Sequence, residues 1–264
     1  MRLIITKKNI GSWAATYILK KIMLKHDEKF VLGLPTGSSA VDMYKHLVEF
    51  YKASQLSFKN VTTFNMDEYI GLDKHHPQSY WTFMNENLFK HIDINKNNIN
   101  IPNGNALDIK QECIDYENKI IQNGGIDLFI GGVGENGHIA FNEPYSSLSS
   151  KTRDKELNTN TLIANSRFFN NNINEVPKSA ITVGIDTLLQ SKEVMILVSG
   201  VKKALALQQC IEGGVSHLWP ISVLQFHKKA IIVADIQACE ELKLKTVRYF
   251  QDLQDEYSYI EDLA

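Results

Sequence analysis

The stretch IDLFIGGVGENGHIAFNEP, residues 126–144, joins an apolar run to a glycine-rich loop that carries Asn136, His138 and Glu143. A short run rich in Ile, Leu and Phe that ends at glycines is typical of a buried strand. Glycine lets the backbone approach a ligand closely, and histidine is the side chain best suited to moving protons near neutral pH. The stretch predicts a strand that ends in a proton-handling loop, and a turn with ordinary polar residues is the alternative.

Strand-like runs and helical periodicity alternate along most of the chain. Four more apolar runs predict strands: FVLGL (30–34), VTTFN (61–65), VMILVS (194–199) and KAIIVA (229–234). Residues repeating at intervals of three and four predict helices near 9–26, 40–54, 79–91, 109–123, 201–212 and 240–254. This alternation predicts an α/β fold with a mostly parallel sheet and helices on both faces.

The composition is that of a globular protein without a nucleic-acid or membrane partner. The chain has 264 residues, 44% of them hydrophobic and 22% charged, and a formal net charge of −2. A phosphate backbone needs a basic surface, and crossing a bilayer needs about 20 consecutive apolar residues. The start, MRLIITKKN, does not have the pattern of a secretory signal. We therefore expect a cytoplasmic protein.

Neither cysteine spacing nor histidine spacing predicts a metal centre. Cys113, Cys210 and Cys239 are odd in number and far apart, which favours free thiols in a reducing compartment. The HHP at 75–77 lacks companion ligands at metal spacing. We expect no metal and no cofactor.

Two segments admit more than one interpretation. Seven asparagines surround a short apolar core between Asn158 and Asn174, and asparagine favours turns. This predicts a flap near 158–179 or a plain surface excursion, and the flap matters if Arg167 points into a ligand site. The aromatic-rich SYWTFMNENLF (79–89) has helical spacing and is predicted to belong to the core.

The loop LPTGSSA, residues 34–40, follows one predicted strand and precedes a helix. Thr36 and Ser38 supply hydroxyls beside the open N–H groups of a helix start, where the helix dipole favours an anion. The loop lacks the lysine of a Walker motif. Simple N-capping by Ser38 or Ser39 is the alternative.

Paired acids follow another predicted strand, in FNMDEYIGL at 64–72. A carboxylate at a strand end is a candidate general base. The alternative is that Asp67 and Glu68 cap the next turn.

Two lysines open a predicted helix in SGVKKALAL, residues 199–207. Cations are unfavourable at a helix N-terminus, and a bound anion would offset that cost. Lys202 or Lys203 is thus predicted to contact an anion, with solvated surface lysines as the alternative.

Taken together, LGLPTG, FNMDEY, GHIAFNEP, ANSRFF, VPKSAITVG and VKKALAL resemble the glucosamine-6-phosphate deaminase family in order and spacing. The likeness runs from MRLI to about KTVRYF at 245–250. It implies a single Rossmann-like domain over 1–264 that uses no metal. It also implies conversion of α-D-glucosamine 6-phosphate and water to D-fructose 6-phosphate and ammonia, in the catabolism of N-acetylglucosamine and sialic acid.

The resemblance also implies roles for individual residues. The base at the sugar's C2 falls on Asp67, the ring-opening histidine on His138 and its supporting glutamate on Glu143. Many relatives carry aspartate where this chain has Asn136, so we expect Glu143 to carry most of the electrostatic support of an imidazolium. The contacts to the substrate phosphate fall on Thr36, Gly37, Ser38, Arg167 and Lys203.

Some family members are homohexamers that N-acetylglucosamine 6-phosphate activates at a subunit interface. Positions that match this second site are Met1, Ser146, Arg153, Lys155 and Tyr249. We expect a homohexamer and treat its activation as a hypothesis, with a solvated pair of charges at Arg153 and Lys155 as the alternative.

Two other functions remain open from the sequence. A 6-phosphogluconolactonase would share the fold and the phosphate loop but would not need a C2 base at Asp67. A sugar-phosphate-sensing domain of a transcription regulator would use the same scaffold without turnover. That second alternative needs a DNA-binding module, whereas this chain begins directly with a predicted strand.

Overall fold

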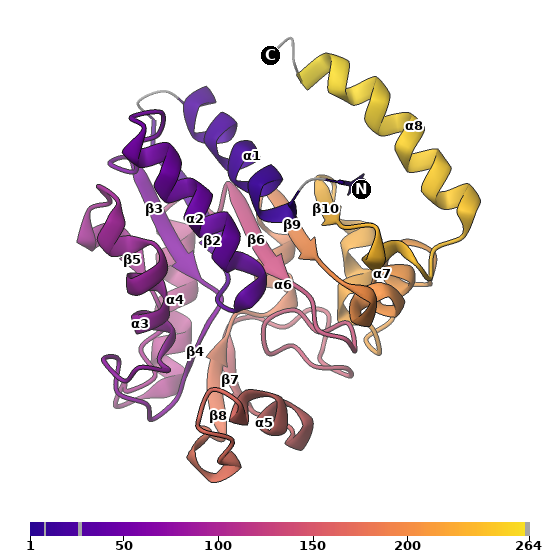
Figure 1. Ribbon diagram of the computed structural model, residues 1–264. Coiled ribbons are helices and arrows are strands. Elements are labelled where there is room, and N and C mark those ends of the chain that lie inside the picture. The colour runs from indigo at the N-terminus through magenta and orange to yellow at the C-terminus, as the bar shows by residue number, and fades with distance from the viewer. Residues whose placement is uncertain (8, 26–27, 262–264) are drawn as a thin grey trace.

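The computed structural model describes residues 1–7, 9–25 and 28–261, and its strands form two sheets (Figure 1). The larger sheet has seven strands in the order β1-β10-β9-β6-β2-β3-β5, and each neighbouring pair in it is parallel. Its strands are Arg2–Ile5 (β1), Phe30–Leu34 (β2), Val61–Asn65 (β3), Ile99–Asn100 (β5), Leu128–Gly132 (β6), Glu193–Val198 (β9) and Ala230–Ala234 (β10). The predicted α/β architecture with a mostly parallel sheet is confirmed.

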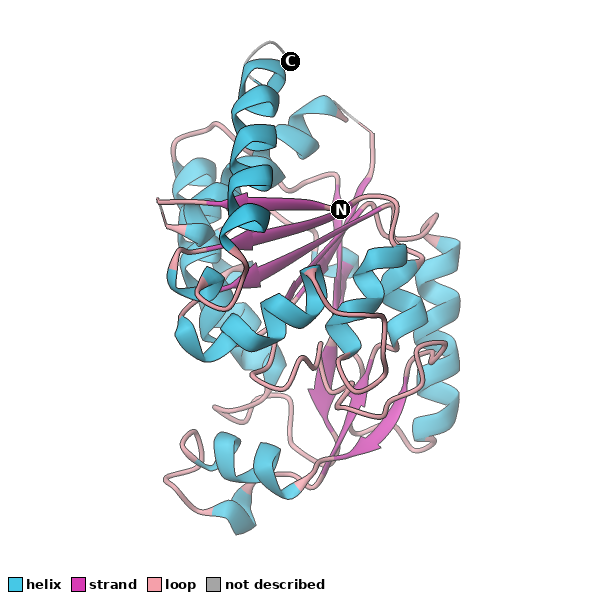
Figure 2. Cartoon of the chain, turned by 90° about the vertical axis from the view of Figure 1, so that its right-hand side faces the viewer, coloured by secondary structure: helices cyan, strands magenta, loops and turns pink. Residues whose placement is uncertain are grey.

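Helices cover both faces of this sheet, as Figures 1 and 2 show. Side chains of α1, α2 and α3 share one apolar cluster, whereas those of α4, α6 and α7 share another. Along β9, Met195 and Leu197 enter the first cluster, while Val194 and Ile196 enter the second. This period of two is that of a strand buried on both faces. The helices are Ile10–Leu24 (α1), Ser38–Lys52 (α2), Tyr80–Asn87 (α3), Ile109–Gln122 (α4), Thr159–Ser166 (α5), Ile185–Leu189 (α6), Ala204–Ile211 (α7) and Leu244–Glu261 (α8).

Several helix boundaries differ from the predicted ones. The segment predicted at 79–91 is split, with α3 followed by a 3₁₀ turn at Phe89–His91. Another 3₁₀ turn, Val201–Lys203, precedes α7. The predicted helix 240–254 begins only at Leu244. The last residue of the predicted helix 9–26 lies outside the described residues.

A second, three-stranded antiparallel sheet lies below the large sheet in the view of Figure 1. It consists of Asp67–Tyr69 (β4), Ser179–Thr182 (β8) and Arg153–Glu156 (β7), in the order β4-β8-β7. The sequence predicted none of these strands, because three or four residues are too few to show a period and β7 reads RDKE. The chain passes from β3 through Met66 into β4, so one segment joins the two sheets.

The asparagine-rich segment contains a short helix and two left-handed turn residues. Asn158 caps α5, its Oδ1 accepting the N–H of Thr161 at 2.8 Å. Asn170 and Asn171 adopt the left-handed backbone, with φ of 53° and 60°, which asparagine tolerates well. Phe169 is buried against the aromatic rings beside β4. Asparagine therefore caps a helix and forms turns here, and the mobility of 158–179 stays a prediction.

The strand order brings the four predicted loops to neighbouring positions. Strands β9, β6, β2 and β3 are consecutive in the sheet, and a predicted loop follows each of them. The order reverses between β6 and β2, and ligands of open α/β sheets bind beyond strand ends at such a point. Within the described ranges, no helix combines the length and apolar composition that a membrane crossing requires.

Candidate active site

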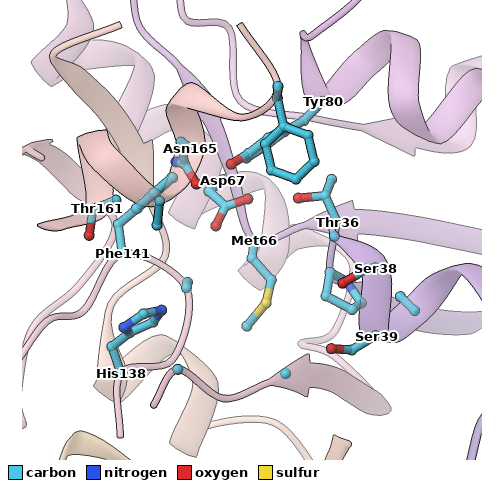
Figure 3. A pocket seen from close by; sticks show the side chains of 18 of the residues that line it. Thr36, Ser38, Ser39, Met66, Asp67, Tyr80, His138, Phe141, Thr161 and Asn165 are labelled. Carbon is cyan, nitrogen blue, oxygen red and sulfur yellow. The ribbon is translucent and has the colours of Figure 1, made fainter. Parts of the chain in front are cut away.

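A cavity of about 990 Å³ lies at these strand ends (Figure 3). Figure 3 shows the side chains of Asp67 and His138 pointing into the same space, with the hydroxyl of Thr36 across from them. Eight of the predicted site residues line the cavity: Thr36, Gly37, Ser38, Asp67, Asn136, His138, Arg167 and Lys203. Glu143 lies behind His138, with its nearer oxygen 3.6 Å from the imidazole Nδ1.

Asp67 lies where the chain passes from the large sheet to the small one. It pairs with Thr182 across β4 and β8, and the backbone of Met66 bonds both Leu34 and Val183. Asp67 is only 7% exposed, and its Oδ1 has no hydrogen-bond partner in the described part of the chain. Burial, and secondarily the charge of Glu68, raises the pKa of Asp67 to about 8. A carboxylate with so little solvation is a strong base once ionised.

Glu68, its neighbour, has a different function. Its two carboxylate oxygens accept the backbone N–H groups of Tyr69, Tyr80 and Trp81 at 2.9, 3.0 and 2.9 Å. Burial raises the pKa of Glu68, whereas these three hydrogen bonds lower it. The capping alternative therefore describes Glu68, which caps the start of α3, and does not describe Asp67.

His138 is oriented by Asn136. The Oδ1 of Asn136 lies 2.7 Å from Nδ1 of His138, and its Nδ2 donates to Oε2 of Glu143 at 2.9 Å. An amide oxygen only accepts, so this contact assigns the proton to Nδ1 and leaves Nε2 as the acceptor. The side chain of Asn136 bonds both His138 and Glu143, so Asn136 orients the ring, while the carboxylate of Glu143 is 3.6 Å from Nδ1.

The surroundings of His138 favour its neutral form. Burial lowers the pKa of the imidazole and the charge of Lys203 lowers it further, while Glu143 opposes both. Gly134 makes the space for the ring, because a Cβ at that position would lie 2.1 Å from Cε1 of His138. The glycine density of the loop thus has a steric cause.

The start of α2 presents open N–H groups to the cavity. Gly37 is the N-cap, with φ of 91° and no side-chain hydrogen bond. The alternative in which Ser38 or Ser39 caps the helix is wrong, because both serines already lie in its first turn. Both serines line the cavity together with Thr36. Hydroxyls and free amides at a helix start form a cradle for an anion.

Three cations lie close together at the cavity. Arg167 ends α5, Lys202 and Lys203 precede α7, and all three line the cavity. Burial lowers the pKa of Lys203 and the charges of Arg167 and Lys202 lower it further, while Glu135 opposes the shift. A dianion bound there would relieve the repulsion among these cations.

Sequence reasoning missed the aromatic and polar wall of the cavity. Tyr80 and Phe83 line it, although their neighbour Met84 does belong to the core as predicted. Two residues of α5 contact the site: Asn165 Nδ2 donates to Tyr69 Oη at 2.9 Å, and Thr161 contacts Glu143. Helical spacing alone cannot separate a core face from a cavity wall, so no signal in the sequence marked these residues.

The positions of the predicted second site lie on separate elements of the chain. Arg153 and Lys155 lie on β7, whereas Tyr249 lies on α8, and these two elements lie apart in both views (Figures 1 and 2). Helix α8 is bound to β1, where Gln254 accepts the N–H of Ile5 at 3.0 Å. Ser146 is buried, and Met1 is exposed beside β1.

Within the described residues, no group of three or more His, Cys, Asp or Glu side chains could hold a metal ion. Cys113, Cys210 and Cys239 are free and buried. The strand ends bring a carboxylate, an imidazole and a group of cations to one cavity. This combination is that of an enzyme that performs acid–base chemistry on an anionic ligand.

Known proteins agree with this class. The family model described as glucosamine-6-phosphate isomerases/6-phosphogluconolactonase matches residues 6–233. A glucosamine-6-phosphate deaminase of Borrelia garinii subsp. bavariensis is 57% identical over 261 residues, covering 97% of each chain. One of Fusobacterium nucleatum subsp. nucleatum is 56% identical over 267 residues, covering 100% of this chain and 97% of that one. The chain belongs to the glucosamine-6-phosphate isomerase/6-phosphogluconolactonase family.

Solved structures agree as well. A protein described as a monomeric glucosamine-6-phosphate deaminase superimposes with a TM-score of 0.88 at 39% identity, covering 91% of this chain and all of that one. A 6-phosphogluconolactonase from Thermotoga maritima has a TM-score of 0.70 at 18% identity, covering 89% of this chain and 99% of that one. The second likeness is one of fold alone.

Proposed function

We propose that the chain is a glucosamine-6-phosphate deaminase, which converts α-D-glucosamine 6-phosphate and water to D-fructose 6-phosphate and ammonia in amino sugar catabolism. The family and the names of the full-length relatives support this. The observation that carries the proposal is the buried carboxyl of Asp67, which faces the same cavity as His138 and has one oxygen without a hydrogen-bond partner among the described residues.

Substrate binding begins at the phosphate. The turn Thr36–Ser38 offers hydroxyls and open N–H groups, and Arg167 and Lys203 offer positive charge. Binding energy from this remote group orients the reacting carbons between the acid and the imidazole. Loss of either cation is therefore expected to weaken turnover as well as binding.

Ring opening requires a proton to move from the O1 hydroxyl to the ring oxygen O5. The Nε2 of His138 is free to accept that proton, because Asn136 holds the other ring nitrogen in its protonated form. The lowered pKa of His138 keeps the imidazole neutral and ready to accept. The same nitrogen then returns the proton to O5 as the C1–O5 bond breaks.

Isomerisation and deamination follow on the open chain. The Asp67 carboxylate takes the proton from C2 and delivers it to C1, and a proton of the amino group passes to O1, so that the 2-amino aldose becomes a 2-imino sugar with a C1 hydroxymethyl group. Water adds to C2, the C–N bond breaks, and ammonia leaves the ketose. Before substrate arrives, the raised pKa keeps Asp67 protonated near neutral pH, and the ammonium group of the arriving substrate favours its ionised form.

One assay separates this function from lactone hydrolysis. The wild type is expected to release ammonia and fructose 6-phosphate from glucosamine 6-phosphate, and Asp67→Asn is expected to bind substrate without turnover. A wild type that hydrolyses 6-phosphogluconolactone and releases no ammonia would overturn the proposal. Unchanged turnover in Asp67→Asn would remove the assigned base.

We also propose that the protein is a cytoplasmic homohexamer that N-acetylglucosamine 6-phosphate activates. The separation of β7, which carries Arg153 and Lys155, from α8, which carries Tyr249, supports a site that two copies build together. Three free and buried thiols support a reducing compartment.

A further inference from the structure

Helix α5 contacts the imidazole support through one hydroxyl. Thr161 Oγ1 donates to Glu143 Oε1 at 2.6 Å, and the other oxygen, Oε2, accepts from Asn136 Nδ2 at 2.9 Å. Asn136 Oδ1 in turn lies 2.7 Å from Nδ1 of His138. These four side chains, Thr161, Glu143, Asn136 and His138, form one continuous hydrogen-bonded row, which we call the histidine support row.

Each bond in the histidine support row has one possible direction. A carboxylate only accepts, so Glu143 takes a proton donor on each oxygen, and the Asn136 amide must turn its NH₂ toward Glu143 and its oxygen toward His138. The Glu143 side chain is 13% exposed, so an oxygen that lost its donor would have little water to replace it. The carboxylate would then rotate to find another donor.

We propose that Thr161 is a positioning residue for the reaction, which fixes the rotation of the Glu143 carboxylate and thereby the amide that orients His138. This inference rests on the proposed function. Thr161 acts through Glu143 and Asn136 and does not touch the reacting atoms. Helix α5, which carries Arg167 at its other end, thus belongs to the support of the imidazole as well as to the phosphate end.

The charged groups around His138 set the direction of the expected effect. Glu143 favours the imidazolium and Lys203 opposes it, and Glu135 acts on Lys203 from the same loop. If the Glu143 carboxylate rotates away, its favourable charge weakens and that of Lys203 does not. The pKa of His138 is then expected to fall below its already lowered value.

The test compares four variants of the full chain with the wild type. Thr161→Val removes the hydroxyl at constant shape, and Thr161→Ala removes it without adding bulk in case the valine variant fails to fold. Thr161→Ser restores the donor. Thr159→Val is the matched control, because Thr159 is exposed on the same helix. Each variant is examined by steady-state ammonia release and by ¹⁵N NMR of the His138 ring.

The valine and alanine variants are expected to lose kcat by about tenfold, equivalent to ~1.4 kcal/mol of barrier, with KM changed less than twofold. In both, the His138 spectrum is expected to show a lower pKa and a smaller fraction of the Nδ1–H tautomer. Thr161→Ser is expected to recover most of the loss, and Thr159→Val is expected to match the wild type.

Two outcomes overturn the inference. A raised KM with an unchanged His138 spectrum would mean that Thr161 contacts substrate directly. Unchanged kcat and an unchanged spectrum would mean that the Thr161 hydroxyl does not position the Glu143 carboxylate. A wild type without ammonia release would refute the proposed function instead, and the NMR comparison would still test the histidine support row.

Discussion

At the scale of single residues, the candidate site holds charged and polar groups in surroundings that solvate them less well than water does. Asp67 has a carboxyl oxygen without a partner in the described structure, and Lys203 stands beside two other cations. Such arrangements lower stability and persist at functional sites, where a ligand supplies the missing interactions. Each of these residues therefore predicts a measurable change on substitution.

The raised pKa of Asp67 predicts a gain in stability from Asp67→Asn. Between the ordinary value of 3.8 and the folded value of about 8, the folded state keeps a proton that the unfolded state has lost. Raising pH through this window therefore lowers the free energy of unfolding of the wild type. Asp67→Asn is expected to be more stable by about 2–3 kcal/mol at pH 8, by less at pH 5, and not at all below pH 4.

Urea denaturation at these pH values measures the difference. Asp252→Asn, at an exposed position of α8, is the control and is expected to change stability by less than ~0.5 kcal/mol. A gain for Asp67→Asn that did not grow with pH would contradict the assignment of a buried, protonated carboxyl.

Gly134→Ala is expected to displace the imidazole. Its Cβ would lie 2.1 Å from Cε1 of His138 and 2.2 Å from Nδ1, so the ring must leave its bond to Asn136. We expect kcat to fall by about 100-fold, the order that misplacement of a catalytic group by about 1 Å causes. Gly214→Ala, where a Cβ would meet no heavy atom within 4 Å, is the control. Equal activities of the two variants would count against His138 as the proton carrier.

Asn136→Asp is expected to move the pH optimum more than it changes the maximal rate. A carboxylate 2.7 Å from Nδ1 favours the imidazolium, so the pKa of His138 rises and the acid limb of the profile moves to higher pH. The new charge also faces Glu143, which can no longer accept a hydrogen bond from position 136. A pH–rate profile identical to that of the wild type would rule out this function of Asn136.

At the scale of elements, Glu68 holds the start of α3 beside the site by accepting its backbone N–H groups. Glu68→Gln keeps the shape but removes the charge that accepts three backbone N–H groups. We expect a loss of about 1–2 kcal/mol in the free energy of unfolding, and a raised KM because Tyr80 lines the cavity. Glu112→Gln, whose carboxylate accepts a single backbone N–H from Asn103, is the control and should lose less. Equal losses would contradict the capping function.

The elements also show which parts of the fold a sequence can predict. Strands β9 and β10 each contain five consecutive apolar residues, so their burial can be predicted from composition. The small sheet has no such signal, because all four residues of its edge strand β7 are charged and β4 is only three residues long. Asp67 was predictable from its place after β3. Thr161 was not, since its partner Glu143 is 18 residues away and only the fold brings them together.

At the scale of the whole molecule, the proposed activator site must be shared between copies. Helix α8, which carries Tyr249, and strand β7, which carries Arg153, lie apart in both views (Figures 1 and 2), so a ligand that contacts both residues would bridge two chains. We expect Arg153→Ala and Tyr249→Ala each to lose the response to N-acetylglucosamine 6-phosphate while keeping the maximal rate. Sedimentation is expected to show a hexamer for the wild type.

Mixing the two variants tests the shared site directly. If Arg153 comes from one copy and Tyr249 from the next, oligomers reassembled from both variants contain some interfaces with neither substitution, and part of the response returns. If both residues acted within one chain, every chain of the mixture would carry a defect and no response would return. The solved deaminase at 39% identity is described as monomeric. A wild type that is likewise a monomer, with hyperbolic kinetics that the acetylated sugar phosphate leaves unchanged, would refute both the hexamer and the activation.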